Sequence, residues 1–251
     1  MNRYFLRLSY KGTLYHGWQI QANANSVQAV VNESLSQILR KEIQTLGCGR
    51  TDTGVHALDF FAHFDSDALP GSYDSDFVYH LNCVLPEDIA VKEIIPVRPG
   101  AHARFDALSR TYQYRITHAK NPFLKNRAMF VRKNLDLGLM RQGSELLMTY
   151  SDFGCFSKNL TQVKTNICKI TEATWEESGD DLLFTIKADR FLRNMVRAIV
   201  GTLLDLGKGK ITLADLSRII ENKNRSEAGA SVEAGGLYLV RIDYPAELFN
   251  A

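Results

Sequence analysis

Short stretches in which apolar and polar residues alternate are the most regular feature of this 251-residue chain. Alternation with a period of two is typical of β-strands that are buried on one face. It is clearest in YFLRLSY at residues 4–10 and in RTYQYRI at 110–116, where Tyr112, Tyr114 and Ile116 share one face. Further strands are predicted at residues 58–65, 88–97, 172–177, 181–189 and 236–244.

Apolar residues spaced three and four positions apart predict helices between these strands. The first helix follows Ser26, whose hydroxyl suits an N-cap, and runs to residue 39. The segment FLRNMVRAIVGTLLDLG predicts a longer amphipathic helix over residues 191–207. Other helices are predicted at residues 77–84, 135–150 and 213–224.

The order of these elements predicts the fold class. Strands and helices mix without the regular alternation of a parallel doubly wound fold. We therefore expect an α+β fold with a largely antiparallel, mixed sheet flanked by helices. No low-complexity segment divides the chain, so we expect two subdomains, residues 1–105 and 106–251, that share this sheet.

Composition changes this picture little. Hydrophobic content is 45% and charged content 23%, and no stretch approaches the roughly 18 apolar residues of a membrane span. The N-terminus lacks the apolar core of a signal peptide, which predicts a cytoplasmic protein with no membrane partner. The four cysteines have no zinc-like spacing, and we expect reduced thiols in or near the core.

Charge is more informative in its distribution than in its total of +2. Residues 104–133 contain eight Lys or Arg and one acid, and residues 187–225 contain nine against four. Two basic segments suggest a polyanionic partner, although solvated faces would look the same. In RTYQYRI, arginines also alternate with tyrosines, which suits base stacking and phosphate contact as well as a plain core strand.

The most unusual stretch is GCGRTDTGVHA at residues 47–57. An aspartate in such a polar, glycine-rich turn often bonds its own backbone, and Asp52 fits that role. Arg50, two residues earlier, favours an ionised carboxylate, which a nucleophile needs and a turn does not. Asp52 and His56 have the spacing of metal ligands on a helix, but Gly54 weakens a helix there and no third ligand is near.

Arginines line the edge of the apolar face of the predicted helix 191–207. Arg190, Arg193 and Arg197 follow one another at intervals of three and four residues. A stripe of this kind commonly lies in solvent. At the edge of an apolar face, however, a partly buried arginine requires a carboxylate or phosphate partner.

Together these segments resemble the TruA family of tRNA pseudouridine synthases. GRTDTGVHA is similar to the family signature GRTDxGVHA, with Thr53 where alanine is more usual. The resemblance extends over nearly the whole chain and is loose only at about 65–78 and 134–185. It continues through YKGTLYHGWQ, NCVLPEDIAV, HARFDALSRTYQYRI, FLRNMVRAIVG and GGLYLVRIDYP.

The resemblance implies a role for each matching residue. Asp52 would be the nucleophile and Arg197 its ion-pair partner. Tyr112 would stack on the uracil and help remove the proton from C5. Arg50 would lie beside the flipped nucleotide, and Leu237 would form part of the apolar wall of the uracil pocket.

The resemblance also implies the reaction and its setting. Uridine is isomerised to pseudouridine in the anticodon stem-loop of tRNA, at positions 38, 39 and 40, in a basic active-site cleft between the subdomains. The enzyme would be a homodimer with no metal and no cofactor. A synthase acting at other RNA positions, a non-catalytic RNA-binding module and a metal-dependent hydrolase are the alternatives.

Overall fold

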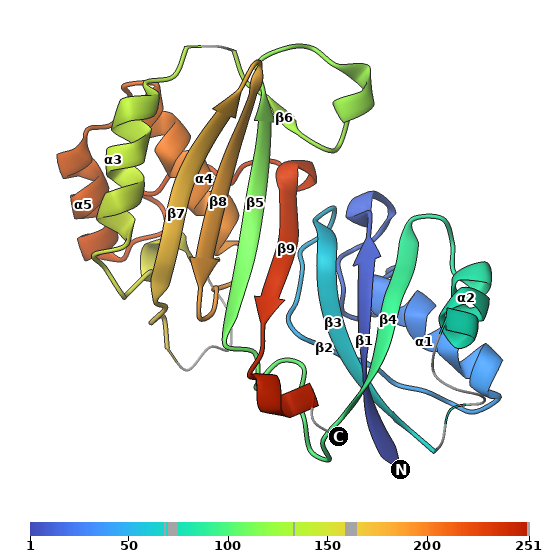
Figure 1. Ribbon diagram of the computed structural model, residues 1–251. Coiled ribbons are helices and arrows are strands. Elements are labelled where there is room, and N and C mark those ends of the chain that lie inside the picture. The colour runs from blue at the N-terminus through green and yellow to red at the C-terminus, as the bar shows by residue number, and fades with distance from the viewer. Residues whose placement is uncertain (68, 70–74, 133, 159–164, 250–251) are drawn as a thin grey trace. The chain divides into compact units, whose positions relative to one another are not determined.

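Two compact units make up the chain (Figure 1). The first comprises Met1–Leu108 and Tyr238–Ala251, and the second comprises Ser109–Leu237. The sequence analysis expected all of residues 106–251 to form one subdomain, whereas by their contacts the residues from Tyr238 onward belong to the first unit. A computed structural model describes residues 1–67, 69, 75–132, 134–158 and 165–249.

The first unit is built on a sheet in which β1 (Asn2–Tyr10) is central. This strand runs antiparallel to both β3 (His56–Ser66) and β4 (Ile89–Val97). The C-terminal β9 (Leu237–Asp243) pairs in parallel with the start of β3, and the short β2 (Leu46–Gly47) pairs with its far end. Because β1 has a neighbour on each side, its last residue is held firmly in the sheet.

Two helices, α1 (Val27–Leu39) and α2 (Ser75–Val84), cover one face of this sheet (Figure 1). The predicted N-cap is confirmed, because the Ser26 hydroxyl accepts a hydrogen bond from the N–H of Ala29 at 3.3 Å. The helix ends at Leu39, as the sequence predicted, and Arg40 caps it in the left-handed conformation at φ 51°.

The second unit has an antiparallel sheet in the order β5 (Ser109–Thr117), β8 (Asp181–Ala188), β7 (Ile170–Ser178). The two-residue β6 (Met129–Phe130) pairs in parallel with the end of β5. One face of this sheet is covered by three helices (Figure 1). They are α3 (Leu137–Leu147), α4 (Met195–Gly207) and α5 (Leu213–Asn222).

The predicted class is confirmed, since both units combine helices with a mixed and mostly antiparallel set of strands. The expected helix over 191–207 is wrong at its start. Asn194 takes a left-handed conformation at φ 66°, so α4 begins only at Met195. Arg193 therefore precedes the helix instead of forming a stripe along it.

Two further expectations concern membranes and thiols. Among the described residues, no helix is long and apolar enough to cross a lipid bilayer. Cys48, Cys155 and Cys168 are buried, and burial raises the pKa of Cys155 to about 12 and that of Cys168 to about 11. Cys83 is exposed on α2, so the expectation of a core position is wrong for that residue.

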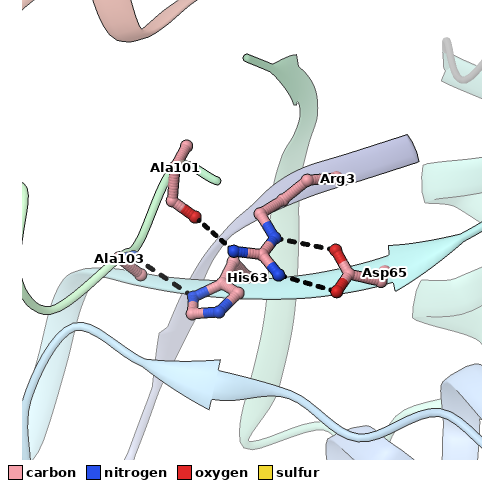
Figure 2. A network of polar contacts seen from close by, with 5 residues as sticks. All are labelled: Arg3, His63, Asp65, Ala101 and Ala103. Atoms are coloured by element: carbon pink, nitrogen blue, oxygen red, sulfur yellow. Dashed lines mark hydrogen bonds and ion pairs between the residues drawn. The ribbon is translucent and has the colours of Figure 1, made fainter. Parts of the chain in front are cut away.

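A polar network, in which the Arg3–Asp65 pair is partly exposed and the His63 ring is buried, joins β1 and β3 to the chain that follows β4 (Figure 2). Arg3 makes two 2.7 Å hydrogen bonds to the Asp65 carboxylate and a third, at 2.9 Å, to the Ala101 carbonyl. Beside it, Nδ1 of His63 accepts the N–H of Ala103 at 3.2 Å. Burial lowers the pKa of His63 to about 4, and nearby cations add to this effect.

This network makes stability depend on pH. The His63 ring binds a proton below about pH 6.5 in the unfolded chain and only below about pH 4 in the folded one. Stability is therefore lost as pH falls through this window, by roughly 2–3 kcal/mol. His63→Asn keeps an acceptor for Ala103 but does not titrate, so its urea midpoint should fall less than that of the wild type between pH 6.5 and 4. The exposed His80, replaced by Asn, is the control and should leave the wild-type slope unchanged.

Candidate active site

Asp52 lies in a tight turn that leads into β3 in the first unit. The N–H of Val55 donates to the Asp52 carbonyl at 3.1 Å, and Gly54 has a φ of +81°, which glycine adopts without strain. Thr51 is buried, Asp52 is half-buried and Thr53 is exposed. The turn thus fixes the backbone on the buried side of Asp52 and leaves its side chain partly open.

The turn rests against residues 11–17, which follow β1 and which we call the cradle loop. The N–H of Gly54 donates to the Tyr15 carbonyl at 3.2 Å. A Cβ atom at Gly12 would lie 2.0 Å from the Val55 oxygen, and one at Gly17 would lie 2.2 Å from the Thr51 oxygen. Only glycine permits so close an approach of the two backbones. This explains the two glycines of YKGTLYHGWQ.

His56 also anchors the turn to the cradle loop. Its Nδ1 accepts the N–H of Gly12 at 3.0 Å, so the ring carries its proton on Nε2. The ring is 2% exposed and packs on Tyr238, with centroids 4.7 Å apart. Within the described part of the chain, no group of three His, Cys, Asp or Glu residues is arranged to hold a metal ion. These contacts give His56 a structural role in holding the turn.

Tyr112 lies near the start of β5 in the second unit, opposite Ile186 of β8. The predicted face is confirmed: Tyr114 and Ile116 are buried, and Tyr112 is half-buried. Its ring meets the edge of Phe191 with centroids 5.2 Å apart at 89°. Tyr112 therefore packs less deeply than a core tyrosine, and Phe191 supports its ring from one side.

Arg197 lies in the first turn of α4, also in the second unit. It is half-buried, and its Nε donates to the Val232 carbonyl at 2.8 Å. In return, the N–H of Val232 donates to the Arg197 carbonyl at 3.2 Å. This pair of bonds fixes the side-chain stem and limits the directions in which the guanidinium can point.

The segment that holds Arg197 is itself fixed. A Cβ atom at Gly201 would lie 1.9 Å from the Ala230 oxygen, so this segment lies directly on the backbone of α4. Arg225 closes it with hydrogen bonds to the carbonyls of Ala228 and Gly229 and, at 2.9 Å, to the Ser231 hydroxyl. The same segment leads to Leu237.

Leu237 is buried at the start of β9, immediately after a tight approach of two backbones. A Cβ atom at Gly236 would lie 2.7 Å from the ring of Tyr114 and 3.0 Å from the Arg115 oxygen. The Tyr114 hydroxyl donates to the Glu233 carbonyl at 2.8 Å, and burial raises its pKa. The position of Leu237 is therefore set by β5, the strand that carries Tyr112.

The predicted site residues are divided between the two units. Tyr112, Arg197 and Leu237 belong to the second unit, and Asp52 belongs to the first. Arg50, also of the first unit, is exposed. Sequence reasoning missed the residues that hold the Asp52 turn, above all Tyr10 and Gly17. The signal that could have found them was the glycine spacing of YKGTLYHGWQ, since paired glycines often mark a close backbone approach.

Comparison with known proteins gives the class first. A family model described as tRNA pseudouridine synthase matches residues 148–245, which include both Arg197 and Leu237. Among solved structures, a CRISPR endoribonuclease Cse3 bound to 19 nt RNA aligns with 82% of this chain and 96% of its own at a TM-score of 0.20 and 12% identity, too low to bear on the fold.

Full-length relatives are named tRNA pseudouridine synthase A. The protein of Bacteroides fragilis is 49% identical over 100% of this chain and 99% of its own length. Those of Bacteroides thetaiotaomicron and Porphyromonas gingivalis are each 48% identical, over 100% and 99% of this chain and 93% and 100% of their own. The chain belongs to the tRNA pseudouridine synthase A family and is an isomerase.

Proposed function

We propose that this chain converts uridine to pseudouridine in the anticodon stem-loop of tRNA, at positions 38, 39 and 40, with Asp52 as the nucleophile. The observation that carries the proposal is the Asp52 turn. A residue that merely formed a turn would need only its own hydrogen bonds. Here a second loop, with two glycines in contact with the turn's backbone, fixes the residues on both sides of the carboxylate.

The reaction needs a carboxylate but no redox partner. The bond between N1 of uracil and C1′ breaks, the base turns, and C5 bonds to C1′. C5 then loses its proton and N1 gains one, so no atom is added or lost. Asp52 either attacks C1′ or adds to C6 of the ring, and in both routes it leaves again at the end. We propose that neither metal nor cofactor takes part.

The other side chains would bind and orient the base. In the proposal Tyr112 stacks on the uracil and assists removal of the C5 proton, while Leu237 supplies an apolar wall. Arg197 would pair with Asp52 and orient its carboxylate. Its bond to Val232 supports this role, because it holds the guanidinium stem in one direction. Arg50, which is exposed, would lie beside the flipped nucleotide and help hold the base out of its stack.

The proposed substrate fits the charge of the chain. The segment 104–132 contains seven Lys or Arg and one acid, and such clusters supply phosphate contacts with little base reading. That suits an enzyme which accepts several neighbouring positions. From the family resemblance, we also propose that the protein acts in the cytoplasm as a homodimer.

The direct test is site-resolved mapping of pseudouridine in a tRNA transcript after incubation with the purified protein and excess chelator. We expect conversion at positions 38, 39 and 40, and none in a matched transcript with cytidine at these three positions. Conversion elsewhere would indicate a synthase of different specificity. Binding without conversion would indicate a non-catalytic module, and activity lost only in chelator would indicate a metal enzyme.

A further inference from the structure

The residue immediately before Asp52 is held by a buried pair of hydroxyl groups. The hydroxyls of Tyr10, the last residue of β1, and Thr51 lie 2.9 Å apart. Tyr10 is 4% exposed and Thr51 8%. A hydroxyl group that is buried away from water destabilises the fold if it has no hydrogen-bond partner. The two groups therefore define one arrangement of the backbone beside Asp52.

The Tyr10 ring is itself fixed in place. It meets the ring of Phe60 edge-on with centroids 5.5 Å apart, and it lies 6.3 Å from the ring of Trp18. Trp18 and Phe60 stack on each other at 4.2 Å. Tyr10 also belongs to a strand with neighbours on both sides. The position of its hydroxyl is thus fixed by the packed ring and the paired strand, unlike that of a hydroxyl on an exposed loop.

Thr51 is held from two directions. Its side chain bonds to Tyr10, and its carbonyl oxygen faces the bare Cα of Gly17, where a Cβ atom would lie only 2.2 Å away. Two residues after Asp52, the N–H of Gly54 bonds to the Tyr15 carbonyl. Asp52 is therefore the half-buried residue of a turn whose flanks are both fixed to β1 and the cradle loop.

We propose that Tyr10 is a positioning residue for the reaction: its hydroxyl fixes Thr51 and, through Thr51, the direction of the Asp52 carboxylate. The proposal rests on the function proposed above, with Asp52 as the nucleophile. Displacement of a reacting group by about 1 Å can cost about 100-fold in rate. A change at Tyr10 should consequently affect the chemical step and leave tRNA binding nearly intact.

The experiment compares single-turnover pseudouridine formation with tRNA affinity and thermal stability. In Tyr10→Phe, the ring packing remains and only the hydroxyl is lost. We expect the rate to fall about 10- to 100-fold, while the dissociation constant for tRNA changes by less than about twofold. Thr51→Val should show the same split, and Thr51→Ser should recover most of the rate. The double variant should lose about as much as either single one, because one interaction is removed.

Tyr244→Phe is the matched control. This tyrosine is in the same unit and its hydroxyl is also hydrogen-bonded, here as a donor to the Ala103 carbonyl, while its ring packs on Phe5 and Phe61. It should lose some stability and keep its rate. Assays are run well below the unfolding temperature of the least stable variant, so that every variant is folded.

The outcomes separate the two proposals. If Tyr10→Phe loses stability as Tyr244→Phe does but reacts at the wild-type rate, the positioning role is overturned and the proposed function stands. If Tyr10→Phe loses tRNA affinity and rate together, the positioning role is also overturned. If Asp52→Asn keeps its activity, the proposed function itself fails, whatever Tyr10 does.

Discussion

Asp52→Asn should yield a folded protein that binds tRNA and forms essentially no pseudouridine. The replacement keeps the size of the side chain, and asparagine suits such turns as well as aspartate does. The Val55 N–H can still donate to the backbone carbonyl at residue 52. What is lost is the negative charge and the nucleophilic oxygen. We expect a fall of more than about 100-fold in the single-turnover rate, which corresponds to about 2.7 kcal/mol of transition-state stabilisation.

Asp67→Asn controls for the loss of one negative charge. Asp67 is exposed in the same unit, where its carboxylate pairs with Lys41 at 3.1 Å. Any gain in tRNA affinity from a less acidic protein should appear in both variants, whereas only Asp52→Asn should lose the rate. If Asp52→Asn reacts at more than a hundredth of the wild-type rate, Asp52 is a turn-forming residue and another group performs the chemistry.

Local patterns were sufficient to predict most elements. The alternation in residues 4–10 and 110–116 and the Ser26 cap depend on neighbouring residues, and each corresponds to an element of the structure. The start of α4 was mispredicted because the backbone conformation of one residue, Asn194, overrides the apolar spacing. Apolar spacing continues back to Phe191, but Asn194 tolerates a left-handed backbone that most residues avoid, and the helix begins after it.

Contacts between distant segments could not be predicted in the same way. The pairing of β9 with β3 joins Tyr238 to His56, and no periodicity in either segment specifies it. The contacts of the cradle loop with the Asp52 turn and with His56 likewise join two segments about 40 residues apart. The family resemblance named Asp52, Tyr112 and Arg197, yet it gave no reason for the glycines beside them. The reason is steric: a side chain at Gly12 or Gly17 would overlap the backbone of the Asp52 turn, which only the folded structure shows.

Gly17→Ala should disturb the Asp52 turn, because it adds a methyl group where the cradle loop touches the backbone of Thr51. Alanine at Gly17 must take a φ of +89°, and its Cβ would lie 2.2 Å from the Thr51 oxygen. To reach even the tight distance of 3.0 Å, the Thr51 carbonyl has to move by about 0.8 Å, the difference between the two values. Such a shift carries Asp52 with it, and we expect the single-turnover rate to fall by more than about tenfold.

Gly100→Ala is the control that separates the effect of the steric contact at Gly17 from the effect of a left-handed backbone conformation. Gly100 is in the same unit with a φ of +82°, but a Cβ atom there meets nothing within 4 Å. Both variants should lose about 1–2 kcal/mol because alanine disfavours the left-handed conformation. Gly17→Ala should lose about 1–3 kcal/mol more, since a methyl group is forced into a packed contact. Urea unfolding of the two proteins measures the difference, and the single-turnover assay shows whether it reaches Asp52. Equal stability and equal rates in the two variants would mean that the cradle loop yields to the methyl group, and that the turn does not depend on the close approach of these backbones.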